Sequence, residues 1–349
     1  MRSTYRREDV VLLLKDITGL VEPQSTQERE ALIQSGRHYC EMLPVEYVPT
    51  QEYMRVYEEV LEVYAEPVAR AVGRLSDKII ERKGRTVVLV SLARAGTPIG
   101  ILVKRYLKMK YNLEVPHYSI SIIRGRGIDE NAMKYLLERY EAKDLLFVDG
   151  WIGKGAILTE LEKAVSFYEG VSLDIAVVAD PANVTELCGT HEDILIPSAC
   201  LNSTISGLVS RTFLREDIIG KKDFHGAVYY EELEEVDLSY DFIERIEKDF
   251  SFDNEVCENK EEGRGIDEVR RLAKIFDIDD INLIKPGIGE TTRVLLRRVP
   301  WKVLIDERYK DKGELRHIVR LAEEKKVEVE YCTLNLYKCC GIIKKLSDL

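Results

Sequence analysis

The chain has 349 residues, of which 45% are hydrophobic, so it is long enough for two domains or for one large domain with an appendage. Its net charge of -11 excludes a uniformly basic nucleic-acid-binding protein. No stretch approaches the ~18 apolar residues of a membrane-spanning helix, and the first residues do not resemble a signal peptide. We therefore expect a cytoplasmic protein without a membrane partner.

The elements predicted from apolar periodicity begin after an N-terminal stretch of about 52 residues that is rich in turn signals. A long helix is expected at 52–83, ended by Gly84. Beyond it, strands at 86–92, 117–123, 145–149 and 173–179 alternate with helices at 97–109, 129–140 and 154–168. This alternation predicts an α/β fold whose mostly parallel sheet carries helices on both faces.

The C-terminal third changes character. Residues 231–264 are rich in acidic side chains and poor in apolar periodicity, which indicates a linker. We place this linker at 241–265, between a first domain at 1–240 and a second at 266–349. In the second domain, predicted strands at 301–305 and 327–331 flank a helix at 312–325, which indicates a small α/β unit.

A glycine-rich loop follows the predicted strand at 145–149. The strand ends in Asp149, and the loop then opens a helix. Ligands of parallel sheets bind at the carboxyl ends of strands, and glycines let backbone N–H groups converge on an anion. The spacing matches neither a Walker A loop nor the GxGxxG dinucleotide motif. We predict a phosphate and ribose site here; the alternative is a tight turn that needs glycine for backbone geometry alone. The predicted residues are Asp149, Gly150, Trp151, Ile152, Gly153, Lys154, Gly155 and Ala156.

Two further loops also carry cationic groups. In the segment from Ser91 to Gly100, a strand again turns into a helix, and Arg94 is suited to a bidentate contact with phosphate. In the segment Arg124-Gly-Arg126-Gly, two arginines stand beside glycines and suit a loop that closes over a polyanion, although alone it also fits a solvated turn.

Together the three loops resemble those of type I phosphoribosyltransferases. The resemblance implies that fold, with residues 1–52 as a hood over the base. It also implies that Asp149 holds the ribose hydroxyls and that Lys154, with the loop amides, holds the 5′-phosphate. Asp149, Arg94 and Lys154 would then be the catalytic groups. The expected contacts to magnesium pyrophosphate are Ser91, Arg94, Ala95, Gly96, Arg124 and Arg126, with Mg²⁺ as cofactor.

Two departures from that family leave a second hypothesis open. Gly150 stands where the family usually has a second acid, and Gly153-Lys154-Gly155 replaces its usual hydroxyl side chains. A catalytically degenerate protein that binds a nucleotide and RNA is therefore an alternative to a phosphoribosyltransferase.

The second domain contains the segment Gly287-Ile-Gly289-Glu290-Thr-Thr292-Arg293 at the expected start of a helix. It is similar to the helix start of the Pelota and kink-turn-binding superfamily, which implies RNA binding through a glycine turn and nearby polar side chains. A helix with a solvated arginine face is the alternative. The RNA-contacting residues implied are Gly287, Gly289, Glu290, Thr292, Arg293 and Arg297.

The combination resembles the PRTase–Pelota family of tellurite-resistance and stress operons, whose members are also labelled cysteine protease StiP. It implies an enzyme that acts on phosphoribosyl pyrophosphate or a related ribosyl phosphate, with RNA as a further partner. It further implies a role in stress-associated nucleoside biosynthesis, and we expect a homo-oligomer.

The label cysteine protease is a third hypothesis, and it requires a thiol paired with a histidine. Cys200, with His191 as the nearest base in sequence, and Cys40, beside His38, are the candidates. Neither lies in a recognisable protease signature, and a buried inert cysteine is the commoner outcome. The seven cysteines are expected to be reduced thiols.

Overall fold

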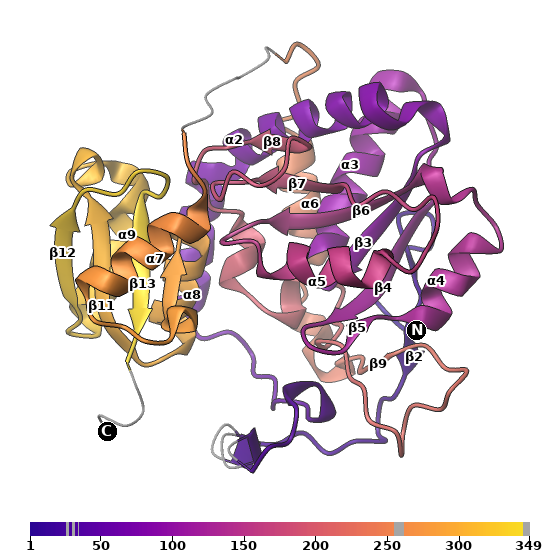
Figure 1. The fold of residues 1–349 in the computed structure, drawn as a ribbon, viewed down its shortest axis with the longest axis horizontal. Helices are drawn as coiled ribbons and strands as arrows, with labels where there is room; N and C mark the ends of the chain where they lie inside the picture. Colours follow the sequence, from indigo (N-terminus) through magenta and orange to yellow (C-terminus); the bar gives the residue numbers. More distant parts are fainter. Residues whose placement is uncertain (26–27, 30–31, 34, 255–261, 345–349) are drawn as a thin grey trace.

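The computed structural model describes residues 1–349 except 26–27, 30–31, 34, 255–261 and 345–349 (Figure 1). The larger domain is built on a sheet with strand order β1-β4-β3-β6-β7-β8, in which β5 pairs with β4. All pairs along this order are parallel, and only β5 is antiparallel to its neighbour. The strands are β1 (Val11–Leu12), β3 (Val88–Ala93), β4 (His117–Ile123), β5 (Gly127–Ile128), β6 (Leu145–Trp151), β7 (Ile175–Ala179) and β8 (Cys188–Thr190).

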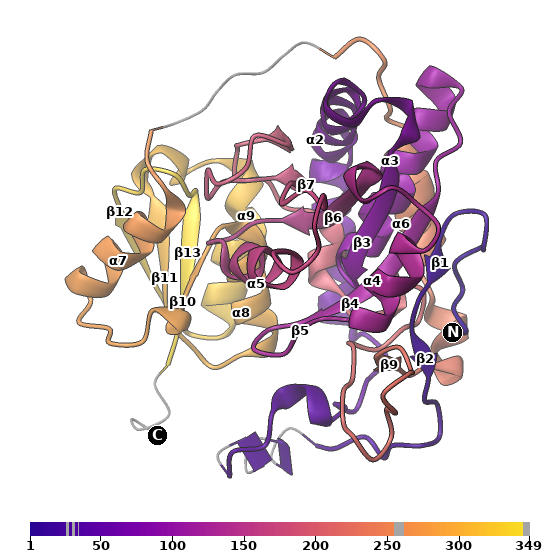
Figure 2. The same cartoon turned by 45° about the vertical axis from the view of Figure 1, so that its right-hand side comes forward.

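Helices cover both faces of this sheet (Figures 1 and 2). On one face, α2 (Gln51–Lys83), α3 (Gly96–Tyr111) and α6 (Ser239–Glu247) pack on strand residues such as Leu89 and Leu146. On the other face, α4 (Glu130–Leu137) and α5 (Ala156–Val165) pack on Val90 and Phe147. Successive strand residues point to opposite faces, so each strand is apolar throughout because both faces are covered. The predicted fold class, a mostly parallel sheet between helices, is confirmed.

The long helix α2 begins and ends where its sequence predicts. Thr50 caps its first turn by accepting a hydrogen bond from the Tyr53 amide. Gly84 ends it with φ 72, a left-handed conformation that favours glycine. A small pair of parallel strands, β2 (Lys15–Asp16) and β9 (Gly226–Ala227), joins the N-terminal segment to the end of the larger domain.

The smaller C-terminal domain has a four-stranded sheet with order β10-β13-β11-β12, as the predicted small α/β unit requires. Helices α8 and α9 pack on one face of this sheet, and α7 packs on the other. Its elements are α7 (Gly265–Ile275), β10 (Ile284–Pro286), α8 (Ile288–Arg297), β11 (Pro300–Asp306), α9 (Arg316–Glu324), β12 (Glu328–Cys332) and β13 (Cys339–Ile343).

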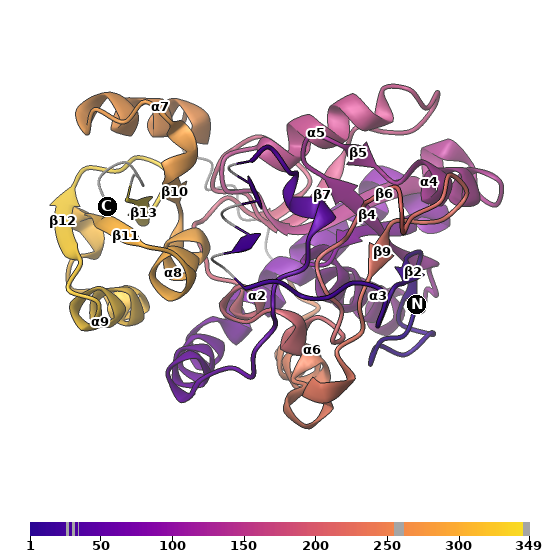
Figure 3. The same ribbon diagram turned by 90° about the horizontal axis from the view of Figure 1, so that it is seen from below.

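The two domains share one hydrophobic core. Ile288 and Leu295 of α8 belong to the same buried cluster as Val148 of β6 and Val68 of α2. Figure 3 shows α8 on the side of the C-terminal domain that faces the larger domain. The C-terminal domain is therefore packed firmly onto the larger one.

The linker predicted at 241–265 includes residues 255–261, which lie outside the described residues. Its first part belongs to α6, where Phe242, Ile243 and Ile246 are buried in the main core. Across the described residues, no helix combines the length and apolar character needed to cross a bilayer.

Candidate functional site

A cleft lies between the strand ends of the larger domain and helix α8. Its outer cavity, of about 240 Å³, is lined by Asp149, Lys154 and Arg124 on one side and by Lys285, Glu290 and Arg293 on the other. A smaller cavity of about 60 Å³ is lined by Arg94 and Arg297, and both cavities share Ala95, Trp151 and Arg293. Loops that the sequence places far apart, including those of both domains, therefore meet at one site.

The loop after β6 supplies most of the cleft wall. The Asp149 carboxylate accepts a hydrogen bond from the Gly150 amide at 2.8 Å, and burial raises the pKa of Asp149 to about 6. Gly155, with φ 91, precedes α5 in the left-handed conformation that glycine permits. The eight residues predicted from Asp149 to Ala156 cover the end of β6, the loop at 152–155 and the first residue of α5, and every one except Gly150 lines the cleft.

Lys154 points toward the C-terminal domain. Its Nζ donates to the carbonyl oxygens of Ile281 at 2.8 Å and Ile284 at 3.3 Å. Burial, together with the nearby cations Lys285 and Arg124, lowers the pKa of Lys154 to about 8. The cleft therefore holds a lysine whose charge is poorly solvated.

The predicted site residues at the end of β3 do not all reach the cleft. Arg94 donates to the carbonyl of Val209 at 3.0 Å and to Asn202 Oδ1 at 3.2 Å. It lines the smaller of the two cavities. Ser91 and Gly96, by contrast, line neither cavity. The Ser91 hydroxyl is buried and bonded to the Gly96 carbonyl at 3.0 Å. A Cβ on Gly96 would lie 2.4 Å from the carbonyl oxygen of Val148. Both residues therefore hold the loop against the sheet, which corrects their expected place in the cleft.

The two arginines of the third loop also separate. Arg124 lines the cleft and donates to Asn282 Oδ1 at 3.3 Å. Arg126 lies outside it and pairs with Glu41 at 3.0 Å, with 48% of its side chain exposed. Arg126 is therefore engaged with Glu41 and does not line the cleft.

The residues expected to contact RNA face the junction between the domains. Glu290 and Arg293 form an ion pair at 3.1 Å inside the cleft, and the Arg293 guanidinium lies 5.9 Å from the Trp151 ring centroid. Arg297 donates to Asn202 Oδ1 and to the Cys200 carbonyl, both at 2.8 Å. Arg293 and Arg297 therefore contact the larger domain.

The turn before α8 is also covered. Gly287, with φ 90, lies against Asp193, and Gly289 lies against Trp151. Thr292 is buried, with its hydroxyl 3.1 Å from His317 Nε2. Gly287 and Gly289 are therefore buried against the larger domain, and Thr292 is buried against α9 of the C-terminal domain, so contact of these residues with RNA stays a prediction.

Asp193 connects the domains, a role that was not predicted from the sequence. Its carboxylate accepts hydrogen bonds from the amides of Ile288 at 3.0 Å and Lys338 at 2.9 Å. Burial raises the pKa of Asp193 to about 6. A helix start readily accepts an anion, but nothing local to residue 193 indicates a partner 95 positions away.

The structure separates the two predicted protease thiols. Cys200 is buried, which raises its pKa to about 12, and His191 contacts Cys188 instead. Cys40 Sγ lies 3.0 Å from His38 Nδ1. That same nitrogen accepts the Cys40 amide at 3.3 Å, as in a local helix cap, and burial raises the pKa of Cys40.

A third thiol lies in a more ordered arrangement at the edge of the large sheet. Cys188 Sγ, on β8, is 3.4 Å from His191 Nε2. His191 Nδ1 lies 3.1 Å from the Asp180 carbonyl oxygen and 3.7 Å from the Asp180 carboxylate. This cluster was not predicted from the sequence. A usable signal existed, because Asp180 and His191 directly follow the neighbouring parallel strands β7 and β8.

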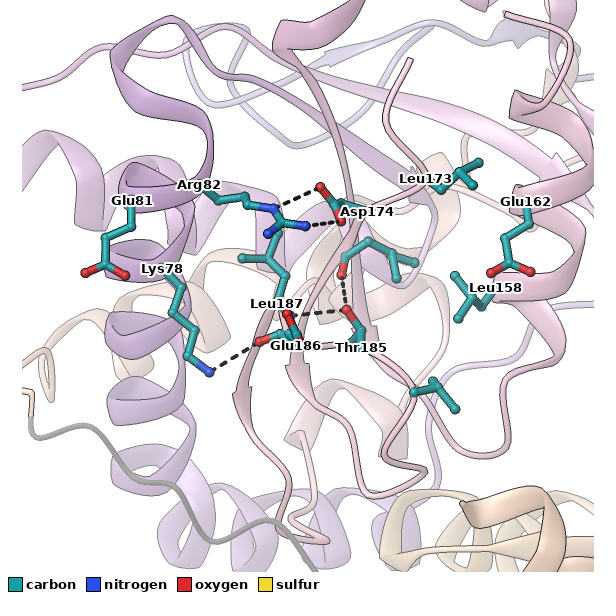
Figure 4. A pocket seen from close by; sticks show the side chains of 12 residues that line it. Lys78, Glu81, Arg82, Leu158, Glu162, Leu173, Asp174, Thr185, Glu186 and Leu187 are labelled. Carbon is teal, nitrogen blue, oxygen red and sulfur yellow. Dashed lines mark hydrogen bonds and ion pairs between the residues drawn. The ribbon is translucent and has the colours of Figure 1, made fainter. Parts of the chain in front are cut away.

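A groove of about 680 Å³ lies at the opposite end of these two strands (Figure 4). Its apolar floor includes Ile175 and Val184, and Leu187, directly before Cys188, also lines it. Acidic groups outnumber basic ones along the rim, where Arg82 pairs with Asp174 at 3.3 Å. The charged rim residues are Lys78, Glu81, Arg82, Glu162, Asp174 and Glu186.

The expected Mg²⁺ has no cage of protein ligands. Within the part of the chain that the structure describes, no group of three or more His, Cys, Asp or Glu side chains is arranged to hold a metal ion. The cleft offers only the carboxylates of Asp149 and Glu290, and Glu290 is paired with Arg293. The residues present do not fit a metal bound by the protein alone.

Comparisons with known proteins match both parts of the chain. The family model described as "Tellurite-like stress resistance cysteine protease StiP" matches residues 3–247. The model described as "PELOTA RNA binding domain" matches residues 263–345. A curated relative from Acinetobacter baylyi, named cysteine protease StiP, is 34% identical over 366 residues, which cover 99% of this chain and 94% of the relative.

Among solved structures, the likenesses are weak. A hypoxanthine-guanine phosphoribosyltransferase from Bacillus anthracis is 17% identical, with a TM-score of 0.26, over 38% of this chain and 77% of its own. A hypoxanthine-guanine-xanthine phosphoribosyltransferase is 14% identical, with a TM-score of 0.27, over 49% of this chain and 93% of its own. Values this low carry no argument about activity.

The expectation of a phosphoribosyltransferase is therefore corrected. The matching family and the full-length relative are both named for cysteine proteolysis, and only the weak structural likenesses carry the other name. The match over residues 3–247 and the identity along nearly the whole chain lead to one conclusion: this chain belongs to the StiP family of tellurite-like stress resistance cysteine proteases, with a C-terminal PELOTA domain.

Proposed function

We propose that this protein is a thiol-dependent peptidase whose nucleophile is Cys188, with His191 as general base and Asp180 as the group that orients it. The observation that carries the proposal is the chain of contacts from Cys188 Sγ to His191 Nε2 at 3.4 Å and from His191 Nδ1 to Asp180. A nucleophile, a base within reach and a third group behind the base are the three parts that thiol catalysis needs. The name of the relative from Acinetobacter baylyi gives independent support.

The contacts favour a particular tautomer of His191. Because Nδ1 lies 3.1 Å from the Asp180 carbonyl oxygen, that nitrogen is the expected proton donor, which leaves Nε2 to accept the thiol proton. The Cys188 thiolate would attack the peptide carbonyl carbon, and His191 would pass the proton to the leaving amine as the C–N bond breaks. Water would then hydrolyse the thioester, releasing the acid and restoring the thiol.

Cys188 is favoured over the other thiols by this geometry. At Cys40, the imidazole contacts the thiol through the nitrogen that also caps the local backbone. At Cys200, the histidine nearest in sequence, His191, contacts Cys188 instead, and the backbone carbonyl of Cys200 is bonded to Arg297. Cys188 is itself fully buried, so a substrate needs the structure to open beside His191, whose side chain is 14% exposed.

The groove in Figure 4 suits an extended peptide, and it approaches the cluster from the end of β8 where Leu187 precedes Cys188. Cys188 pairs in register with Val177, which points to the same face of β7 as Ile175 on the groove floor. β8 is also the last strand in the sheet order, and such edges accept added strands.

The cellular setting and the second domain belong to the same proposal. A catalytic thiol stays reduced in the cytoplasm, so we place the protein there. RNA binding by the C-terminal domain is proposed from the name of its family model. Association of identical copies stays a prediction.

The test compares three alanine variants in an assay of peptide hydrolysis. We expect Cys188→Ala to abolish turnover and Cys200→Ala and Cys40→Ala to retain it. Mass spectrometry after limited treatment with iodoacetamide should show that Cys188 is modified faster in the wild type than in His191→Gln. In the variant, no base is present to form the thiolate. Full turnover by Cys188→Ala would refute the assignment.

A further inference from the structure

We propose that the cleft between the domains binds the terminal phosphate of a nucleotide, either a free nucleotide or the end of an RNA chain, and that both domains hold it at once. This inference concerns a site separate from Cys188 and does not depend on peptidase activity.

The larger domain contributes Arg94, Arg124 and Lys154 to the linked cavities. The C-terminal domain contributes Lys285, Arg293 and Arg297 to the same space. Two carboxylates, Asp149 and Glu290, stand against these six basic groups. The surplus positive charge favours an anion, and its division between the domains means that one ligand would contact both.

Arg293 is paired with Glu290, but the hydrogen-bond partners of Lys154, Arg124, Arg94 and Arg297 are neutral oxygens that orient these cations without neutralising them. Lys154 donates to two backbone carbonyls, and Arg124 donates to the amide oxygen of Asn282. Arg94 and Arg297 both donate to Asn202 Oδ1, at 3.2 Å and 2.8 Å. A neutral oxygen holds a cationic side chain in place while leaving its charge available to a ligand.

The cations are also poorly solvated and close enough to repel one another. Burial lowers the pKa of both Lys154 and Lys285, and Arg124 lowers the pKa of each further. Burial and the charges of Arg293 and Arg94 likewise lower the pKa of Arg297 to about 10. A phosphate dianion placed among them would remove that repulsion where water screens it weakly.

The size of the cavity limits the ligand. A volume of about 240 Å³ accepts a phosphate with part of its nucleoside, but no folded RNA or protein segment. The ring of Trp151 forms part of the wall and offers an aromatic surface for a base. One side of the cleft belongs to the domain that matches an RNA-binding family. A nucleotide phosphate therefore fits better than an isolated inorganic anion.

Trp151 makes the test direct, because the chain has only two tryptophans, Trp151 and Trp301. In the full-length Trp301→Phe protein, the emission of Trp151 is titrated with adenosine 5′-monophosphate and with adenosine. A short RNA with a 5′-phosphate is compared in the same way with its 5′-hydroxyl form. We expect at least one phosphorylated probe to change the emission and to bind about tenfold more tightly than its unphosphorylated partner.

The two phosphorylated probes distinguish the sources. Binding of adenosine 5′-monophosphate assigns a free nucleotide, and binding of the phosphorylated RNA alone assigns a strand end. Failure of both to bind would overturn the proposal.

Variants test whether both domains hold the ligand. Arg124→Gln and Lys285→Gln should each weaken binding about tenfold, because each removes one charged contact. Arg270→Gln is the matched control, since Arg270 is 62% exposed on α7 and pairs with Asp267, and it should leave affinity unchanged. Cys188→Ala should also bind normally, which separates this site from the peptidase. Loss of binding in Arg124→Gln but not in Lys285→Gln would refute a ligand shared by both domains, and an equal loss in Arg270→Gln would refute a defined site.

Discussion

The cleft between the domains and the thiol cluster at the sheet edge are built in opposite ways. In the cleft, the reactive groups come from both domains, such as Lys154 and Arg293, and they are charged and partly buried. At the edge, Cys188, His191 and Asp180 lie within twelve positions of one another, on or directly after two adjacent strands. The thiol cluster is a local structure, whereas the cleft exists only because two domains pack together.

The two sites therefore depend on different contacts. The thiol cluster needs the register between β7 and β8, in which Val177 pairs with Cys188 and Ala179 with Thr190. The cleft needs α8 to stay docked, and the Asp193 carboxylate holds the first turn of that helix. Loss of docking should therefore damage the cleft and leave the cluster at the sheet edge intact.

The largest effect is expected at the thiol cluster. We predict that His191→Gln lowers kcat for peptide hydrolysis by at least about 100-fold, because glutamine cannot carry the proton from Cys188. Asp180→Asn should give a smaller loss, since the backbone carbonyl of residue 180 still orients the imidazole. The control is His38→Gln, which should keep most of the activity. If His38→Gln were as inactive as His191→Gln, Cys40 would become the better nucleophile.

An intermediate effect is expected at the docking contact. Asp193→Asn should destabilise the protein by about 1–3 kcal/mol, because an amide NH₂ would face a backbone N–H donor. The measurement is the free energy of unfolding in urea. Glu192→Gln, at the exposed neighbouring position, is the control and should change little. The same variant should weaken nucleotide binding in the cleft but preserve peptide hydrolysis, which tests the independence of the two regions.

The contact at Asp193 also predicts a pH dependence. The pKa of Asp193 in the folded protein is about 6, above the ~3.9 expected when unfolded. Folding therefore takes up a proton between these values, and the stability that comes from Asp193 falls as the pH rises from about 4 to 6. Unfolding curves of the wild type and Asp193→Asn should differ more at pH 4 than at pH 7. A constant difference would contradict the raised pKa.

The smallest effect is expected for Lys154 in the cleft. Its pKa of about 8 is lowered by burial, Lys285 and Arg124, while Asp280 and Glu290 oppose the change. A phosphate would stabilise the charged amine, so affinity should fall about five- to tenfold between pH 7 and pH 9. Emission of Trp151 measures this affinity, and Lys154→Gln should flatten the profile. An equally steep profile in Lys154→Gln would assign the titration to another group.

Much of the fold followed from local patterns. The apolar run at 145–149 and the glycine turn after it predicted β6 and α5, since a strand covered on both faces has few alternatives. Gly84 ended the long helix, as local chemistry requires. The same reasoning placed the loops after β3 and β6 at one edge, because parallel strands point their carboxyl ends the same way.

The site was harder to predict because its partners are distant in sequence. Ser91 and Gly96 had the residue types of an anion loop, but they proved to be packing groups, bonded or pressed against neighbouring backbone. Asp193 showed no signal, because its partners are two amides of another domain. Cys188 was missed because a three-residue strand gives almost no periodicity to recognise.

By itself, the sequence determined the alternation of strands and helices, the two-part organisation and the glycine-rich strand ends. It could do so because these depend on neighbours a few positions apart. Only the tertiary structure decided that α8 turns its arginines inward, that Asp193 holds the helix, and that two candidate sites are one cleft. These features depend on how two apolar surfaces pack, and burial energy between distant segments leaves no local pattern in either one.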